Sequence, residues 1–305
     1  MIPVYVIGSS NTDMVIEAET LPAPGETVLG GKFFMNAGGK GANQAVAAAR
    51  LLGNVTFVAN VGNDPFGLQA IEQFIQEGIN ISFITTDALL PSGVALIIVD
   101  KNAENCITVA PGANMQLDIL KAKTALDSIT KNAILLLQQE IPMETVEFII
   151  EYVNPDIHKI ILNPAPANFL NPPVFSKIFL ITPNETEAEL LTGIKVSNIE
   201  TAEKAADALH EKGVPNVIIT LGAKGAYLST KECKKLINVA AVIPKDTTAA
   251  GDCFNGALAV AIAEGMSMEE AVSFACNAAA ISVTRMGAQA SMPCREEVDA
   301  AALLA

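Results

Sequence analysis

One stretch organises this chain: Asp246-Thr247-Thr248-Ala249-Ala250-Gly251-Asp252-Cys253-Phe254-Asn255-Gly256-Ala257. It predicts the start of a helix whose first backbone N–H groups lie uncovered, because Ala249, Ala250 and Gly251 carry little or no side chain. The helix macrodipole adds partial positive charge, so this end attracts an anion such as a phosphate. We interpret the carboxylate of Asp252 as a base that takes a proton from a hydroxyl during phosphoryl transfer. A Gly-Asp pair is also common as a simple turn and helix cap, so the rest of the chain must decide.

The bulk composition limits the kind of protein. With 305 residues, of which 50% are hydrophobic and 17% charged, the chain can bury a large core as one α/β domain or as one with a small appendage. A net charge of −14 argues against nucleic acid or an anionic membrane as a partner. The start of the chain lacks the basic segment of a signal peptide, and no segment has the roughly 18 uninterrupted apolar residues of a membrane helix, so we expect a cytoplasmic protein.

Cysteine and histidine offer little for catalysis or for metal binding. The five cysteines are odd in number, widely spaced and without a C-x-x-C pair, so the sequence predicts neither a disulfide framework nor a zinc site. His158 and His210 are the only histidines, and neither lies near a glycine-rich loop. A carboxylate must therefore do any general-base work.

Strands and helices alternate along most of the chain, which predicts a doubly wound, mainly parallel sheet flanked by helices. Strands are expected at residues 4–8, 55–61, 133–137 and 159–162, and helices at residues 67–77, 117–128 and 143–153. Ligands bind at the carboxyl ends of the strands in such sheets. Asn11 and Asp13 follow the first strand and Glu140 follows a later one, so each could contact a ligand. Ordinary turns would also explain the first two, and a charge at the following helix start would explain Glu140.

Two segments, residues 14–36 and 93–110, leave this alternation. The β-like pieces of the first are expected at residues 14–16, 27–29 and 32–34, and the second resembles a hairpin. Together they predict a small β-sheet lid inserted in a single domain that spans residues 1–305. A lid suits a phosphoryl-transfer enzyme, because such an enzyme must keep water away from its nucleotide.

A glycine-rich loop precedes an alanine-rich helix expected at residues 45–52. The loop reads Asn36-Ala37-Gly38-Gly39-Lys40-Gly41-Ala42-Asn43-Gln44. Its glycines permit the backbone to approach a ligand closely, and Asn43 can point into the same space. The loop is not a P-loop, because Gly41 follows Lys40 where a Ser or Thr is required.

Two later turns offer nucleotide contacts. Asn184 and Glu187 follow a strand and lie three positions apart at a helix start, so both can reach a hydrated Mg²⁺ or the phosphates, unless they only cap the helix. Residues 217–226 are typical of a strand, a tight glycine turn and a second strand. Such a turn can carry a nucleotide phosphate or ribose, although hairpin geometry alone also explains it.

These motifs together resemble the ribokinase branch of the PfkB carbohydrate kinase family. The two family signatures are matched by Gly38-Gly39-Lys40-Gly41-Ala42-Asn43 and by Asp246-Thr247-Thr248-Ala249-Ala250-Gly251-Asp252, in the family's order and separation. Further similarity lies in Gly8-Ser9-Ser10-Asn11-Thr12-Asp13, Pro24-Gly25-Glu26-Thr27, Asn163-Pro164-Ala165-Pro166 and Thr182-Pro183-Asn184-Glu185-Thr186-Glu187. The resemblance implies a ribokinase-like α/β fold and ATP-dependent phosphorylation of a sugar, D-ribose in this branch, at its primary 5-hydroxyl.

The resemblance also implies roles for individual positions. Asp252 would be the base, and the amides of Ala249, Ala250 and Gly251 would form the anion hole. The sugar would be held by Asn11, Asp13, Gly39, Lys40, Asn43, Glu140 and Asp252. ATP would contact Asn184, Thr220, Leu221, Gly222, Ala223, Lys224, Gly225, Gly251 and Cys276, with Glu187 helping to place Mg²⁺. A bound K⁺ would lie at Asp246, Thr248, Ser282, Arg285, Gly287 and Ser291, and the lid would pair two subunits of a homodimer.

Two alternatives stay open. A related kinase could act on another sugar or on a nucleoside, such as fructose, deoxyribose or adenosine, and the side chains of the lid and of Asn11 would decide this. A catalytically silent sugar or nucleotide sensor could use the same fold, but a sensor has no need of a base at Asp252.

Overall fold

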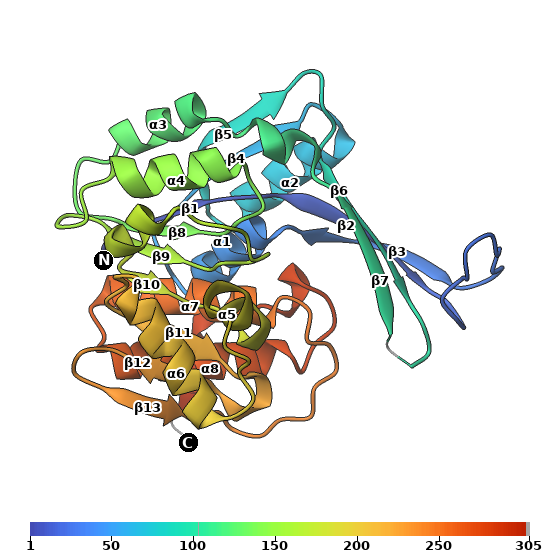
Figure 1. Cartoon of the computed structure of the whole chain (residues 1–305). Helices are drawn as coiled ribbons and strands as arrows, with labels where there is room; N and C mark the ends of the chain where they lie inside the picture. Colours follow the sequence, from blue (N-terminus) through green and yellow to red (C-terminus); the bar gives the residue numbers. More distant parts are fainter. Residues whose placement is uncertain (103, 303–305) are drawn as a thin grey trace.

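A nine-stranded sheet forms the centre of the molecule (Figure 1). The computed structural model describes residues 1–102 and 104–302. The strands of this sheet are β1 Val4–Ile7, β4 Val55–Gly62, β5 Asn80–Asp87, β8 Ile134–Leu137, β9 Lys159–Leu162, β10 Leu180–Ile181, β11 Val217–Thr220, β12 Ala226–Ser229 and β13 Lys234–Ile237. Their order is β13-β12-β11-β10-β9-β8-β1-β4-β5, and all neighbours are parallel except β11 with β12 and β12 with β13. The predicted doubly wound, mainly parallel sheet is confirmed.

Helices cover both faces of the sheet, which explains why its central strands are continuously apolar. Strand β8 reads Ile-Leu-Leu-Leu, and all four side chains are fully buried. Leu136 packs against the layer of α1 Lys40–Arg50, α2 Pro65–Gln76, α7 Ala250–Glu264, α8 Met268–Ser282 and α9 Arg295–Ala302. Its neighbours in the strand pack against the layer of α3 Ile119–Asp127, α4 Met143–Tyr152, α5 Glu185–Thr192 and α6 Ile199–Glu211. None of these described helices is both long and apolar enough to cross a membrane.

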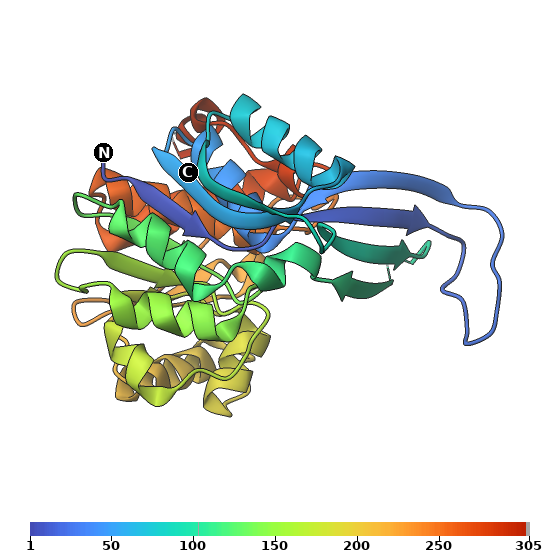
Figure 2. The same cartoon turned by 90° about the horizontal axis from the view of Figure 1, so that it is seen from above.

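A second sheet projects from the body, as both views of the chain show (Figures 1 and 2). Its strands are β2 Asn11–Glu17, β3 Lys32–Gly38, β6 Gly93–Val99 and β7 Asn105–Ala110, in the order β3-β2-β6-β7. Strands β2 and β6 pair in parallel from Asn11 with Gly93 to Glu17 with Val99. This pairing joins the two predicted excursions in one four-stranded sheet, which we call the lid.

The structure differs from the local predictions at several places. Residues 27–29 are not a strand but part of the long loop between β2 and β3, where Gly30 and Gly31 take positive φ angles that strand pairing does not accommodate. Strand β5 was not predicted, because Asn80–Asp87 mixes polar and apolar residues, which suits its place at the sheet edge. Helix α1 begins at Lys40, five residues before the predicted start, directly after Gly39 with φ 87°.

Helices α1 and α7 cross at close range. A Cβ atom on Gly256 would lie 2.7 Å from the Ala47 side chain and 2.7 Å from the carbonyl oxygen of Gln44, so only glycine permits this approach. One turn towards the start of each helix, the same crossing brings Asp252 of α7 beside Asn43 and Gln44 of α1. The contact between two glycine- and alanine-rich helices thus assembles residues that lie more than 200 positions apart in sequence.

Candidate active site

A polar pocket lies where β9, β10 and β11 end and where α1, α5 and α7 begin. Its volume is about 170 Å³. The residues lining it are Lys40, Asn163, Ala165, Thr182, Asn184, Glu187, Thr220, Ala249, Gly251, Asp252 and Asn255. Its position agrees with the rule that open α/β sheets bind ligands at the carboxyl ends of their strands.

Asp252 lies in the first turn of α7 and is only 6% exposed. Its Oδ2 accepts a hydrogen bond from Asn43 Nδ2 at 2.9 Å, and its Oδ1 accepts one from Gln44 Nε2 at 2.9 Å. Burial raises the pKa of this carboxyl, whereas the charge of Lys40 and the two amide hydrogen bonds oppose that rise. The structure therefore holds a buried carboxylate, with donors on both oxygens, at the wall of the pocket.

Lys40 lies among four carboxylates. Burial alone would lower its pKa, but Asp252, Glu140, Glu187 and Asp13 together raise it above the ordinary lysine value. The pKa of Asp13 is raised to about 6, first by burial and then by the charges of Glu140 and Asp252. The structure brings Lys40, Asp13, Glu140 and Asp252, all predicted to bind the sugar, together with Glu187, and this concentrated negative charge keeps the buried Lys40 in its ammonium form at neutral pH.

The Glu140 side chain hydrogen-bonds at the start of α1 rather than in the helix that follows it in the chain. Its Oε2 accepts the backbone N–H of Lys40 at 3.0 Å and the hydroxyl of Ser9 at 2.5 Å. The carboxylate therefore caps the start of α1, where the helix macrodipole favours negative charge. Gly39 stands at the N-cap position, and a Cβ there would lie 2.7 Å from the backbone nitrogen of Asn11. Only glycine brings these two parts of the predicted sugar site so close.

The start of α7 has the open geometry predicted for an anion site. Ala249 is held at φ 58° in the left-handed region, a strained conformation that often marks functional sites. A Cβ on Gly251 would meet nothing within 4 Å, so space is open in front of it. The Ala250 N–H donates a long 3.3 Å bond to the Thr247 carbonyl. Among the described residues, the N–H groups of Ala249 and Gly251 donate to no backbone acceptor.

Asn184 and Glu187 form a capping box at the start of α5. Asn184 Oδ1 accepts the N–H of Glu187 at 2.8 Å, and Glu187 Oε2 accepts the N–H of Asn184 at 2.9 Å. Both residues also line the pocket, and burial raises the pKa of Glu187. Capping leaves the second oxygen of Glu187, Oε1, and the amide nitrogen of Asn184, Nδ2, available to a ligand.

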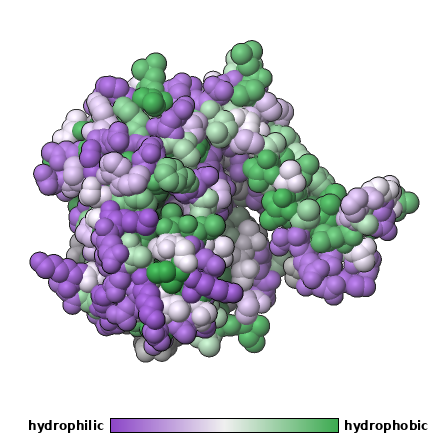
Figure 3. Space-filling model, in the orientation of Figure 1, coloured by the Kyte–Doolittle hydropathy of each residue, from purple (hydrophilic) through white to green (hydrophobic). Residues whose placement is uncertain are grey.

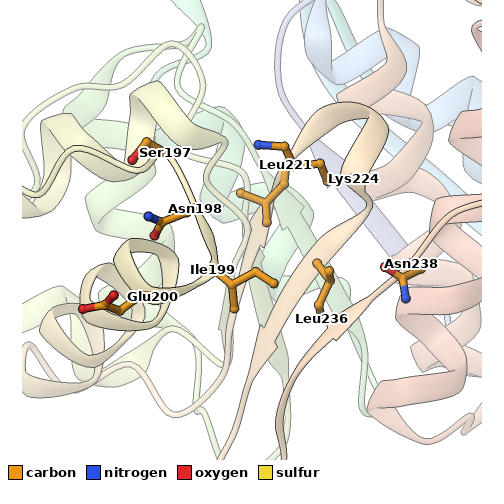
Figure 4. Close-up of a pocket in the computed structure, with 8 residues that line it drawn as sticks. All are labelled: Ser197, Asn198, Ile199, Glu200, Leu221, Lys224, Leu236 and Asn238. Carbon is orange, nitrogen blue, oxygen red and sulfur yellow. The ribbon is translucent and has the colours of Figure 1, made fainter.

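The other predicted nucleotide residues are split between two faces of the sheet. Leu221 and Lys224 line a larger pocket of about 630 Å³ beside the start of α6 (Figure 4), and Asp252 is not among the described residues that line it. Cys276 is buried in α8 and packs with the helical layer on the opposite face. Gly222, Ala223 and Gly225 form the turn between β11 and β12, and Thr220 alone of this stretch lines the pocket of Asp252.

The predicted K⁺ positions gather on two loops that Asp246 holds together. Its Oδ1 accepts the N–H of Thr248 at 2.9 Å, and its Oδ2 accepts the N–H of Gly287 at 2.8 Å. Ser282 and Ser291 donate their hydroxyl protons to nearby carbonyls, and Arg285 pairs with Glu297. The backbone carbonyls of Arg285 and Gly287 accept no hydrogen bond from any described residue. Unpaired carbonyl oxygens fit a hard cation that prefers oxygen ligands.

Sequence reasoning assigned no role to several buried amides around this pocket. Gln44, Gln138 and Asn163 are almost fully buried and are joined by hydrogen bonds beneath Asp252. Asn114, which follows the lid strand β7, donates to Asn11 Oδ1 at 2.8 Å and fixes that side chain. Gln138 and Asn163 each follow an apolar strand, and Asn163 also stands in a stretch that resembles the family, and these are the signals that could have singled them out.

Comparison with known proteins identifies the fold as the ribokinase-like α/β fold of sugar kinases. The PfkB family of carbohydrate kinases matches residues 1–295. The chain is 45% identical to a ribokinase of Haemophilus influenzae, over 96% of this chain and 95% of that protein, and 37% identical to a deoxyribokinase of Salmonella typhi, over 96% of each. The chain belongs to the PfkB family of carbohydrate kinases.

Solved structures agree with this assignment. Ribokinase from Thermotoga maritima superposes with a TM-score of 0.90 at 43% identity, over 99% of this chain and 100% of the other. Arabidopsis thaliana ribokinase, solved in complex with ribose and ATP, superposes with a TM-score of 0.88 at 32% identity, over 98% of each chain. The predicted family and fold are therefore confirmed.

We expect Gly256→Val to separate α1 from α7 and to destabilise the protein. The added side chain overpacks a contact that already excludes a Cβ, at a cost of about 1–3 kcal/mol or more. The measurement is the free energy of unfolding by denaturant, with Ala300→Val on the exposed face of α9 as the control. Equal stability of the two variants would contradict the close crossing.

We expect Asp13→Asn to stabilise the unliganded protein at neutral pH. Because the folded-state pKa of Asp13, about 6, exceeds the unfolded value of 3.8, folding favours the protonated form, and this contribution is lost as pH rises from 4 to 6. The variant should gain up to about 3 kcal/mol at pH 7.5, with a smaller gain at pH 5. Denaturant unfolding at both pH values measures this, with exposed Asp156→Asn as control; a gain independent of pH would refute it.

Proposed function

We propose that this protein transfers the γ-phosphoryl group of ATP to the primary 5-hydroxyl of D-ribose, giving D-ribose 5-phosphate and ADP. The observation that carries the proposal is the position of Asp252, a buried carboxylate one residue after an open helix start. A carboxylate at this position repels an anion and would weaken a site that only bound anions. It is useful where a hydroxyl must lose a proton to become a nucleophile. The relatives named ribokinase support D-ribose as the acceptor.

In the mechanism that this geometry supports, Asp252 accepts the proton of the 5-hydroxyl as the phosphoryl group is transferred. A carboxylate is too weak a base to remove an alcohol proton beforehand, so proton transfer accompanies a loose transition state. The N–H groups of Ala249, Ala250 and Gly251 stabilise the charge on the transferring oxygens, and the Ala250 N–H exchanges its long bond to Thr247 for the phosphoryl oxygen. Positioning and amide electrostatics supply most of the acceleration.

The acceptor sugar is held by the polar cluster at the base of the lid. Acceptor oxygens for its hydroxyls come from Asn11, Asp13 and Glu140. Lys40 and Asn43 can donate hydrogen bonds to it. Gly39 lets the backbone come close to the sugar. Strand β2 carries two of these residues, so lid and sugar site are continuous. Closure of the lid over the sugar excludes water that would otherwise hydrolyse ATP.

ATP lies along the other wall of the pocket in this proposal. Asn184 and the turn at residues 220–225 contact the nucleotide, Cys276 contributes through the packing of α8, and Glu187 helps to place Mg²⁺. Mg²⁺ neutralises the phosphate charge when it is bound. The Glu187 oxygen left free by the capping box fits this role, since Mg²⁺ usually binds through one or two carboxylates and keeps several waters.

We also propose a structural K⁺ on the loops that Asp246 joins. Thr248, Ser282 and Ser291 would add oxygen ligands to the free carbonyls of Arg285 and Gly287. The first of these loops leads directly into Ala249, so a cation there would fix the anion hole without contacting the substrate.

The chain forms, in this proposal, one domain of residues 1–305 whose lid pairs with that of a second copy. On one lid face the exposed side chains include Phe33, Met35 and Leu96, and on the other Ile107 and Val109. Figure 3 shows apolar residues gathered over this projecting part of the surface. An apolar sheet face that its own chain leaves exposed to water is stabilised when it packs against the same face of a second copy.

We expect the protein to run as a dimer, twice the 31.9 kDa of one chain, in size-exclusion chromatography with light scattering. The double variant Met35→Asp and Ile107→Asp places a charge on each lid face and should give monomers, because a buried unpaired charge opposes association. Leu120→Asp, at an exposed site on α3 away from the lid, should remain dimeric. A monomeric parent protein would refute pairing through the lid.

The experiment that tests the function measures ADP release from ATP with D-ribose, 2-deoxy-D-ribose, D-fructose and adenosine, each with and without K⁺. We expect selective turnover of D-ribose, increased by K⁺. Turnover of 2-deoxyribose instead would favour the second candidate, which the similarity to a deoxyribokinase supports. Absence of turnover with every acceptor would refute the proposal and favour a sensor.

A further inference from the structure

Gln44 lies beneath the active site without lining the pocket. It is fully buried in α1, and its side chain makes three hydrogen bonds to other side chains. Its Nε2 donates to Asp252 Oδ1 at 2.9 Å and to Asn163 Oδ1 at 3.0 Å. Both amide protons of Gln44 are thereby used, one of them on the proposed base.

The backbone carbonyl of Thr182 determines the orientation of the Gln44 amide through Asn163. Asn163 Nδ2 donates to the Thr182 carbonyl at 3.3 Å, so Asn163 Oδ1 must point the other way and can only accept. That acceptor requires the nitrogen of Gln44, rather than its oxygen, on the side that faces Asn163 and Asp252. A flipped Gln44 amide would place its oxygen against two other oxygens, which is strongly unfavourable.

Gln138 completes the arrangement from the opposite side. It follows β8, is fully buried, and its Nε2 donates to Gln44 Oε1 at 2.5 Å. Gly8, at the end of β1, makes room for this amide, because a Cβ there would overlap Gln138 Oε1. Two strand ends of the central sheet therefore hold the Gln44 amide in place.

The Gln44 amide also helps to fix the plane of the Asp252 carboxylate. Asn43 donates to Oδ2 and Gln44 to Oδ1, so rotation of the carboxylate about its terminal bond would break both hydrogen bonds. Each carboxylate oxygen keeps a second lone pair for the substrate hydroxyl. With Asn43 alone, one oxygen would be left without its amide donor.

We infer that Gln44 is a positioning residue for Asp252, held in its orientation by Asn163 and Gln138, which fixes the plane of the carboxylate that accepts the sugar proton. This inference rests on the proposed function, since it gives Gln44 a role only where Asp252 acts as a base. Gln44 acts through Asp252 and contacts no substrate.

Loss of Gln44 should also change the titration of Asp252. The hydrogen bond from Gln44 stabilises the ionised carboxylate and lowers its pKa. The other charged and titratable groups that face Asp252 are Lys40 on α1, Asp13 on β2, Glu140 after β8, Glu187 on α5 and the adjacent Cys253 on α7. None of them is altered by a change at Gln44, so a shifted profile reports the lost hydrogen bond.

The test is the pH dependence of kcat and of the sugar KM for Gln44→Met, which keeps the length of the side chain and removes its hydrogen bonds. We expect kcat to fall about 10- to 100-fold, because a carboxylate that is misplaced by about 1 Å loses that much. The sugar KM should change less than about threefold. The acid limb of kcat should move up by about one pH unit, since a charged hydrogen bond is lost.

Two further variants keep the test decisive. Gln138→Met should shift kcat and its acid limb in the same direction by a smaller factor, and it replaces Gln44→Met if that variant does not fold. Gln139→Met alters the adjacent buried glutamine, which bonds the Asn168 N–H and not Gln44, and should leave the acid limb in place.

The outcomes separate this inference from the proposed function. A parent protein that phosphorylates no acceptor refutes the function, and the role of Gln44 fails with it. A parent protein that turns over normally, while kcat and its acid limb are unchanged in folded Gln44→Met, refutes the positioning role alone. A rise in KM with kcat and the acid limb unchanged also refutes it, because the residue would then only support the sugar site.

Discussion

Asp252→Asn is expected to lower kcat by about 10²- to 10⁴-fold, the range attributed to a general acid or base. The amide has almost the same shape as the carboxylate but cannot accept the proton of the sugar hydroxyl. Folding should persist, because the replacement removes a buried charge whose pKa burial already raises, and this gain offsets the acceptor that either Asn43 or Gln44 loses. The measurement is kcat at saturating sugar and ATP, together with the thermal midpoint of unfolding.

The matched control is Asp299→Asn, which makes the same chemical change on the exposed face of α9. It should retain the turnover of the parent protein. Near-normal kcat in folded Asp252→Asn would contradict the assignment of the base and would leave the anion hole as the main source of catalysis.

Lys40→Met is expected to lower kcat/KM for the sugar by about 10²-fold or more at pH 7. Its charge lowers the pKa of both Asp252 and Asp13, so its loss raises both values and favours protonated, inactive carboxyls. The acid limb of kcat/KM should move to higher pH, and part of the activity should return at pH 9. The measurement is the pH profile of kcat/KM from pH 5 to pH 9.

Two comparisons isolate the effect of the charge. Lys40→Arg keeps a cation among the carboxylates and should leave the acid limb near its original pH, even if the larger guanidinium weakens sugar binding. Lys204→Met removes a lysine from an exposed ion pair on α6 and should have no effect. An unshifted acid limb in Lys40→Met would show that its charge does not control the carboxylates.

The layers of the fold could be predicted because their signals are local. Runs such as Ile134–Leu137 are apolar at every position, which is typical of strands buried on both faces, and they alternate with helical segments. The two excursions were predicted to form a lid together, but the pairing of their strands was not predicted. The parallel pairing of Asn11–Glu17 with Gly93–Val99 joins segments 82 positions apart, and no local pattern encodes that register.

Residues of the site could be predicted where a reactive or charged side chain stands inside a recognisable sequence motif. Asp252 and Lys40 stand in glycine-rich signatures, and the structure places both at one pocket. Gln44 stands in an alanine-rich helix, and a lone amide there gives no sign of whether it faces solvent or a carboxylate on another helix. Cys276 shows the opposite case, since the family resemblance alone assigned it to ATP, and the structure buries its side chain in α8.

The most direct test of the central claim is a phosphorus NMR measurement of the reaction of ATP with D-ribose, run with the parent protein and with Asp252→Asn. We expect one new phosphomonoester signal, coupled to the protons on carbon 5 and formed in equal amount to ADP, and almost none with the variant. A phosphate on another carbon, or equal product formation by the variant, would contradict the central claim.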